Sequence, residues 1–191
     1  MGESTELDLE TELEESEIDL EPADVQDVSL KTEQLEGRKR RLTACIDIPH
    51  PVGQVWQVLS DYEALSEFIP NLAKSKLIER PDGGIRLEQV GSQKVLRLKF
   101  SARVVLDLEE TFPHTINFQM VEGDFKSFAG SWNLEPINNS NSPQTHLCYI
   151  LEVTPKLTMP VGFIESRIRK DLPANLLAIR QRTSLLEGER L

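Results

Sequence analysis

The sequence predicts an α+β domain in which a curved antiparallel sheet of about seven strands wraps around a long C-terminal helix. Three observations predict this fold. Residues 72–155 carry almost nothing but strand signals, two short helical segments come before them, and one long amphipathic segment follows. A continuous run of strands must cover its apolar face, and the last segment is the only large cover in the chain. Because a sheet curled around a helix leaves space between the two, we expect a cavity for an apolar ligand.

Charge separates the N-terminal residues from the rest of the chain. Residues 1–36 contain fourteen acidic residues and one basic residue and lack Phe, Tyr and Trp, whereas the whole chain has a formal net charge of −11. Such a segment cannot bury enough apolar surface to offset the entropy that ordering costs. We therefore expect a disordered acidic tail over residues 1–37 and one ligand-binding domain over residues 38–187.

The domain is expected to open with one strand and two short helices. Residues 42–48 alternate between apolar and polar side chains, which predicts a strand. Pro51 suits the first turn of a helix, and apolar residues at helical spacing extend that helix over residues 51–59. A second short helix, residues 62–68, ends before Pro70, because the residue that precedes a proline is biased away from helical geometry.

Six strands are expected next. The strongest signal covers residues 96–108, where seven apolar residues fall on one face and polar residues on the other. A strand of this length must bend to remain in a small domain, so we expect a bulge or bend near Ser101 and Ala102. The six predicted strands cover residues 72–79, 85–93, 96–108, 116–120, 128–134 and 147–153.

The spacing of apolar residues becomes helical beyond Pro160. Six apolar residues between Val161 and Ile179 form one stripe, which predicts a long amphipathic helix. Pro173 lies inside it and removes one backbone donor, so we expect a kink that divides a first segment, about 160–172, from a second that runs to about Leu186.

Three motifs resemble a known family. They are VWQVLSDYEALSEFIP at residues 55–70, GSWNLEP at residues 130–136 and DLPANLLAIR at residues 171–180. Together they resemble the START/Bet v 1-like helix-grip (SRPBCC) superfamily, in particular its polyketide cyclase/dehydrase and coenzyme Q-binding branch, over residues 40–185. The resemblance implies a helix-grip fold and a function among lipid or quinone binders, cyclases and a ribosome-associated toxin type. It implies no shared catalytic residues.

Bulky apolar side chains on the inward phase of the strands are the candidate ligand-binding residues. The resemblance implies a ligand entrance between the second short helix with its loop and the terminal helix. Tyr149 and Trp132 each bring one polar atom into an apolar interior, where a ligand carbonyl could be its partner. The candidates are Leu65, Phe68, Ile69, Phe100, Phe118, Met120, Phe128, Trp132, Tyr149, Met159, Phe163 and Ile164, with Pro70 and Val161 beside the entrance.

Residues that would indicate catalysis or metal binding are scarce in the sequence. His50, His114 and His146 have no carboxylate or cysteine at ligand spacing and are interpreted as surface or capping residues. Cys45 and Cys148 lie on the polar phase of predicted strands, so their thiols could be close if those strands are neighbours, but they are interpreted as inert reduced thiols. We assign no catalytic residue, metal or cofactor.

The terminal helix carries several basic residues close to the expected entrance. Arg167, Arg169 and Lys170 are candidates for transient docking on an anionic membrane surface. No segment reaches the ~20 apolar residues of a membrane span, and the N-terminus lacks the features of a secretory signal. We therefore expect a cytoplasmic monomer, peripheral at a membrane at most, that does not bind nucleic acid.

Three functions remain open. The leading one is a non-enzymatic binding or carrier protein for an apolar small molecule such as a lipid, an isoprenoid quinone or a polyketide-like compound. The second is a polyketide cyclase or dehydratase, which would need a titratable group inside the cavity; apart from Tyr149, none is predicted to point inward. The third is a macromolecular interaction module of the ribosome-associated toxin type, favoured if side chains fill the cavity.

Overall fold

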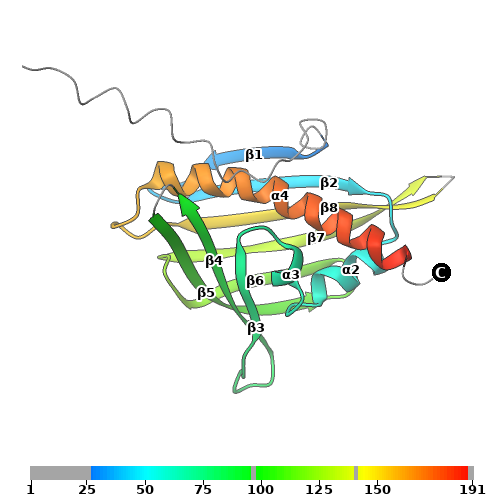
Figure 1. Ribbon diagram of the computed structural model, residues 1–191, viewed down its shortest axis with the longest axis horizontal. Coiled ribbons are helices and arrows are strands. Elements are labelled where there is room, and N and C mark those ends of the chain that lie inside the picture. The colour runs from blue at the N-terminus through cyan, green and yellow to red at the C-terminus, as the bar shows by residue number, and fades with distance from the viewer. Residues whose placement is uncertain (1–26, 96–97, 140–141, 189–191) are drawn as a thin grey trace, which may run out of the picture.

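The computed structural model describes residues 27–95, 98–139 and 142–188. Eight strands form one antiparallel sheet in the order β1-β2-β8-β7-β6-β5-β4-β3 (Figure 1). In chain order the strands are β1 (Ser29–Gln34), β2 (Arg40–Ile48), β3 (Leu72–Leu77), β4 (Ile85–Val95), β5 (Leu98–Thr111), β6 (Thr115–Gly123), β7 (Ser127–Asn139) and β8 (Ser142–Thr154).

Helices cover one face of this sheet. α2 (Val52–Ser60) and the single turn α3 (Leu65–Phe68) connect β2 to β3, and α4 (Val161–Gly188) lies across the sheet (Figure 1). α4 packs against β2 and α2. The predicted fold class is therefore confirmed: a curved antiparallel sheet grips a long C-terminal helix. No helix in the described ranges is long and apolar enough to cross a membrane.

The core lies between the sheet and the helices. On β2 the alternating residues Leu42, Ala44, Ile46 and Ile48 are buried, and their neighbours face outward. Side chains without exposed surface come from the adjacent strands and from α4, which fixes the register because a slip of one residue would turn every apolar side chain outward. These side chains include Leu134, Leu147, Leu176 and Ile179.

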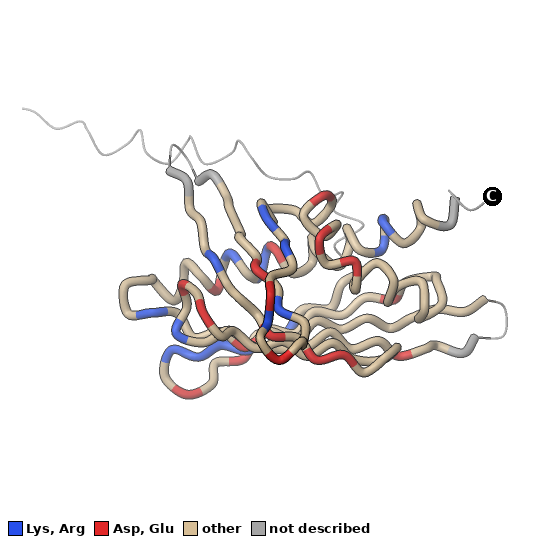
Figure 2. The backbone as a smooth tube through the Cα atoms, turned by 90° about the horizontal axis from the view of Figure 1, so that it is seen from below, with Lys and Arg blue, Asp and Glu red and all other residues tan. Residues whose placement is uncertain are grey.

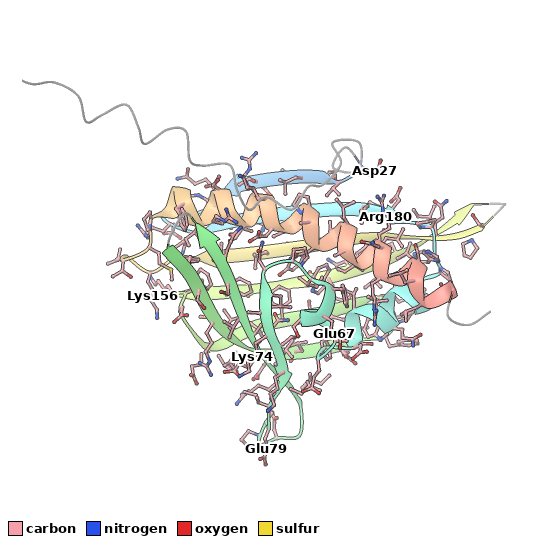
Figure 3. All side chains as sticks on the ribbon, in the orientation of Figure 1. Asp27, Glu67, Lys74, Glu79, Lys156 and Arg180 are labelled. Atoms are coloured by element: carbon pink, nitrogen blue, oxygen red, sulfur yellow. A yellow bond between two sulfur atoms is a disulfide. The ribbon has the colours of Figure 1, made fainter. Side chains whose placement is uncertain are left out.

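The eighth strand, β1, lies in the segment expected to be disordered. Ser29–Gln34 pairs with β2, and Asp27 forms an ion pair of 2.9 Å with Arg180 on α4 (Figure 3). The expectation of disorder is thus wrong for residues 27–37, whereas residues 1–26 lie outside the described residues. An edge strand buries little, and only Val28 and Leu30 of this segment pack on the core, so its sequence lacks the apolar alternation of the inner strands.

Two further details bear on the expected bends. Pro173 lies inside α4, which runs from Val161 to Gly188 without interruption, so α4 is one helix, and a kink of its axis at Pro173 stays a prediction. The irregularity in the β5–β6 pairing falls at Val105 and Leu106, where β6 carries one extra residue, Val121, rather than near Ser101 and Ala102.

The two cysteines are not separate thiols. Cys45 on β2 and Cys148 on β8 are directly opposite each other, with Cα atoms 4.1 Å apart, and form a disulfide. The interpretation as inert reduced thiols is therefore wrong. The pairing could not be derived from sequence because 103 positions separate the two residues and only the β2–β8 register brings them together.

Candidate functional site

A cavity of about 240 Å³ lies between the sheet and α4. The inward-facing residues of β4 to β8 form its sheet side, and α4, α3 and the loop after α3 form the opposite side. Most of the lining is apolar. Residues that line it include Leu59, Leu65, Ile69, Leu72, Leu87, Val104, Leu106, Leu108, Ile116, Leu151, Ile164, Ile168, Leu172 and Ile179.

Aromatic rings form one wall of this cavity. Trp132 on β7 and Tyr149 on β8 are directly opposed and stack with ring centroids 3.8 Å apart and planes 7° apart. The ring centroid of Phe118 lies 5.9 Å from the ring centroids of both Tyr149 and Phe128. Gly130 permits this packing, because a Cβ atom there would lie 2.7 Å from Phe118 Cζ and 2.0 Å from the Ile150 carbonyl oxygen. The wall offers flat apolar surfaces suited to a ring-bearing ligand.

The helix side of the cavity carries polar groups. Arg167, Asp171 and Asn175 are spaced four residues apart on α4, so they share one face of the helix, and all three line the cavity. Arg167 Nε and Asn175 Oδ1 are buried without a hydrogen-bond partner among the described residues. Burial raises the pKa of Asp171, although Arg167 and a hydrogen bond from Asn71 oppose the shift. A buried polar atom without a partner is costly, so this row of side chains is suited to a polar ligand group.

Further polar groups lie between α2 and α3 and on the sheet. Tyr62 is buried, and its hydroxyl donates a hydrogen bond to Glu110. Gln89 on β4 lines the cavity and donates to Ser75 Oγ at 3.2 Å. Burial raises the pKa of both Tyr62 and Tyr149, so both phenols stay neutral near pH 7. These groups offer neutral hydrogen bonding, whereas charge is confined to α4.

The α3 region is held to α4 by side-chain contacts. Asn71 adopts a left-handed backbone conformation with φ of 61° and donates from Nδ2 to Asp171 Oδ1 at 3.1 Å. The Arg182 guanidinium lies 5.6 Å from the ring centroid of Phe68. These contacts connect the loop after α3 to the helix that carries the polar row. They lie where the family resemblance implies the ligand entrance.

Most predicted ligand-binding residues lie on the cavity wall. Those that line it are Leu65, Ile69, Phe100, Phe118, Phe128, Trp132, Tyr149 and Ile164. Four others pack against the core around the cavity without lining it: Phe68, Met120, Met159 and Phe163. Phe163 contacts Phe100 edge to face at 5.4 Å, and the Met159 carbonyl accepts a hydrogen bond from Arg38. A role in ligand binding stays a prediction for all twelve residues.

The polar row on α4 was missed. Arg167, which we expected to face a membrane surface, instead lines the cavity, and only Arg169 and Lys170 of the basic group are exposed. The expectation that no ionisable group besides Tyr149 points inward is also wrong, since Asp171 does so. The spacing of four between Arg167, Asp171 and Asn175 was the available signal, but apolar periodicity alone assigns them to a solvated face.

Comparisons with known proteins agree with this architecture. The profile of the family described as polyketide cyclase/dehydrase and lipid transport matches residues 48–179. The ribosome association toxin RatA of Escherichia coli K12 is 25% identical over 131 residues, which cover 68% of this chain and 77% of that protein.

Solved structures share the fold at low sequence identity. A STAR-related lipid transfer protein from Xanthomonas axonopodis superposes with a TM-score of 0.65 at 15% identity, covering 83% of this chain and 94% of that one. The Zhui aromatase/cyclase from Streptomyces sp. R1128 superposes with a TM-score of 0.61 at 16% identity, covering 76% and 94%. At these identities the likeness shows the fold alone. Since the family profile spans most of the chain, this protein belongs to the polyketide cyclase/dehydrase and lipid transport family.

Proposed function

We propose that this protein binds or carries a compact apolar small molecule, ring-bearing or isoprenoid, that presents one polar or anionic group to α4. A single observation carries the proposal: an aromatic wall and a row of incompletely hydrogen-bonded polar side chains face the same cavity. The volume of about 240 Å³ lies just below the usual range of ~300–1,000 Å³ for small-molecule sites. A compact ligand therefore fits better than a lipid with two long acyl chains.

Arg167 is the residue expected to recognise the polar group. Its guanidinium lies at the cavity with Nε unpartnered, so a ligand oxygen would supply a hydrogen bond that the free protein lacks. A hydrogen bond to a charged group is worth about 1.5–3 kcal/mol. Asn175 Oδ1 offers a hydrogen-bond acceptor about one helical turn beyond Asp171. This acceptor suits a hydroxyl of the ligand that lies beside the anionic or carbonyl group.

A pair of dyes tests both parts of this proposal. N-phenyl-1-naphthylamine carries the apolar rings alone, and 1-anilinonaphthalene-8-sulfonate carries closely similar rings with an anionic group. Both should bind the folded protein and gain fluorescence. Arg167→Met keeps the side-chain bulk and removes the charge, so it should weaken the sulfonate dye about 10- to 100-fold and leave the neutral dye within about twofold.

The matched control is Arg169→Met, an exposed position two residues away on α4, which should change neither affinity. Equal loss of both dyes in Arg167→Met would show that the residue supports packing only. Failure of wild-type protein to bind either dye, together with no co-purifying molecule in native mass spectrometry, would contradict the binding function itself.

A cyclase or dehydratase function is the second candidate, and Asp171 favours it. A cavity carboxyl whose pKa is raised by burial is a candidate general acid or base, and Arg167 could stabilise negative charge developing on a substrate oxygen. If the protein is such an enzyme, Asp171→Asn should retain dye binding and abolish conversion of a poly-β-ketone substrate. Unchanged recovery of that substrate from wild-type protein would contradict catalysis.

The interaction-module alternative rests on the similarity to a toxin whose name refers to ribosome association. Acidic and basic residues are interspersed along the described strands (Figure 2), and some form ion pairs across strands, as Arg103 does with Glu88 and Glu122. Such a surface gives no particular support to binding a highly charged particle. Co-sedimentation with ribosomes that survives moderate salt, in protein that binds neither dye, would favour this alternative.

A further inference from the structure

Four polar side chains meet on the outer face of the sheet, of which three can bind a metal ion and the fourth is hydrogen-bonded to one of these three. Cys45 and Asp47 alternate on β2, and Cys148 and His146 alternate on β8. The register pairs Cys45 with Cys148 and Asp47 with His146, so the four occupy two adjacent rows on the face turned away from α4. The apolar residues between them, Ile46 and Leu147, point inward and are buried.

Three potential metal-ligating atoms lie close together in this group. The sulfur atoms of Cys45 and Cys148 and a ring nitrogen of His146 all lie within 4.8 Å of one another. His146 Nε2 is 3.3 Å from Cys148 Sγ, and His146 Nδ1 is 2.6 Å from Asp47 Oδ1. A carboxylate only accepts hydrogen bonds, so Nδ1 donates to Asp47, and in the neutral ring Nε2 is then the nitrogen with a lone pair, on the side of the sulfur atoms.

The distance between His146 Nε2 and Cys148 Sγ matches that of two ligands on one tetrahedral ion, whereas the two sulfur atoms are bonded to each other and must separate before they can bind it. Zinc bonds to cysteine sulfur at ~2.3 Å and to histidine nitrogen at ~2.0 Å, which separates such a nitrogen and sulfur by about 3.5 Å. A carboxylate on the distal nitrogen is the usual support of a zinc-binding histidine, because it fixes the tautomer and the ring orientation. Asp47 is placed for that role. All three ligand residues are half-buried, so an ion between them could also bind water.

We propose that Cys45, Cys148 and His146 form a site for Zn²⁺ that the disulfide closes and reduction opens. An external dithiol transfers two electrons and two protons to the Cys45–Cys148 bond and itself becomes a disulfide. Zn²⁺ then binds both sulfur atoms as thiolates, releasing their protons to solvent, and His146 Nε2 as the third ligand. The same sulfur atoms cannot be bonded to each other and ligate the ion, so the two states exclude each other.

This site is separate from the cavity but shares its strands. Cys148 precedes Tyr149 on β8, and Asn133, its partner on β7, follows Trp132. The proposal therefore stands whether or not the cavity binds a small molecule. Its test needs no cavity ligand.

The experiment measures Zn²⁺ binding to the full chain by isothermal titration calorimetry, with tris(2-carboxyethyl)phosphine as the reductant or with no reductant. Reduced wild-type protein should bind one Zn²⁺ per chain at least 100-fold more tightly than oxidised protein. Cys45→Ser and Cys148→Ser should each lose that binding. His146→Ala should weaken it at least 10-fold, and Asp47→Asn should weaken it about 10-fold. The matched control, His114→Ala, removes a different histidine, which is exposed, and should leave Zn²⁺ affinity unchanged.

Co²⁺ provides a second readout that does not depend on the cysteine variants folding. Bound to reduced wild-type protein, Co²⁺ should show thiolate charge-transfer bands and the strong visible bands of a tetrahedral site. His146→Ala, which keeps both cysteines, should alter the visible bands. Three results would overturn the proposal. The first is equal Zn²⁺ affinity in reduced and oxidised protein, and the second is a Co²⁺ complex without thiolate bands. The third is that, in reduced and metal-free protein, Cys45 and Cys148 react with an alkylating reagent only after denaturation.

Discussion

The two halves of α4 differ in what they contact. In residues 172–188 the side chains of Leu176, Ile179 and Thr183 are at most 1% exposed and pack into the core. In residues 161–171 most side chains are only half-buried, and Arg167 and Asp171 face the cavity. Ion pairing helps to hold this first half, since Glu165 accepts from Arg40 at 2.9 Å. The difference indicates that the second half is the main anchor of the fold, although Leu172, Asn175 and Ile179 also reach the cavity, and that the first half forms the charged and less buried part of the cavity wall.

The largest expected effect is on stability, in the anchoring half. Leu176→Ala removes a side chain with no exposed surface and should lower the free energy of unfolding by about 2–5 kcal/mol. Ile168→Ala, at a half-buried position on the cavity wall, should cost less than about 1.5 kcal/mol, because part of its surface is already exposed. Urea unfolding of the two variants measures both. Equal costs would contradict the division of α4 into an anchor and a wall.

The sheet residue opposite the wall half should affect ligand binding more than stability. Trp132 is half-buried and stacks on Tyr149 rather than filling the core. Trp132→Ala should therefore cost about 1–2 kcal/mol, below the ~3–5 kcal/mol of a fully buried tryptophan, while N-phenyl-1-naphthylamine affinity falls about tenfold. Trp56→Ala, at a 7% exposed position outside the cavity lining, is the contrasting variant. A full core-sized loss for Trp132→Ala would assign the residue to packing.

Asp171 should make the wall half sensitive to pH. Burial raises its pKa in the folded protein, so the folded state binds the proton more tightly than the unfolded chain, and the stability from this group is lost as the pH rises through that pKa. Asp171→Asn should therefore raise the melting temperature at pH 7, because the neutral amide avoids the burial of a charge. Calorimetry at several pH values should show this gain vanish below the usual pKa of aspartate.

The smallest effect concerns the exposed side of the wall half. Arg169 and Lys170 are exposed, so docking on an anionic membrane remains a prediction for these two residues. Arg169→Glu with Lys170→Glu should weaken co-sedimentation with phosphatidylserine-containing vesicles by at most about 1 kcal/mol for each removed charge, and the difference should fade as salt rises. Lys76→Glu on the distant β3 is the control. Equal binding to neutral vesicles would rule out charge-driven docking.

Strong periodicity made most of the fold predictable. Alternation identified the inner strands because each has one buried face, and the helical stripe identified α4. β1 was missed because an edge strand needs little apolar surface, and the Cys45–Cys148 pair because register, not spacing, creates it.

The candidate site was predictable only in part. Its apolar residues follow from the same alternation as the core, whereas the polar row of Arg167, Asp171 and Asn175 depends on how α4 is rotated over the sheet. A sequence does not fix that rotation when polar residues also flank the apolar stripe.

β8 serves both surfaces of the sheet with one alternating sequence. Tyr149 and Leu151 line the cavity, and His146 and Cys148 lie on the outer face. A replacement on this strand alters one surface and leaves the other intact. Insertion or deletion of a single residue between Thr145 and Leu151 would instead exchange the two sets, because side chains alternate with a period of two. The strand should therefore accept changes of residue type far more readily than changes of length.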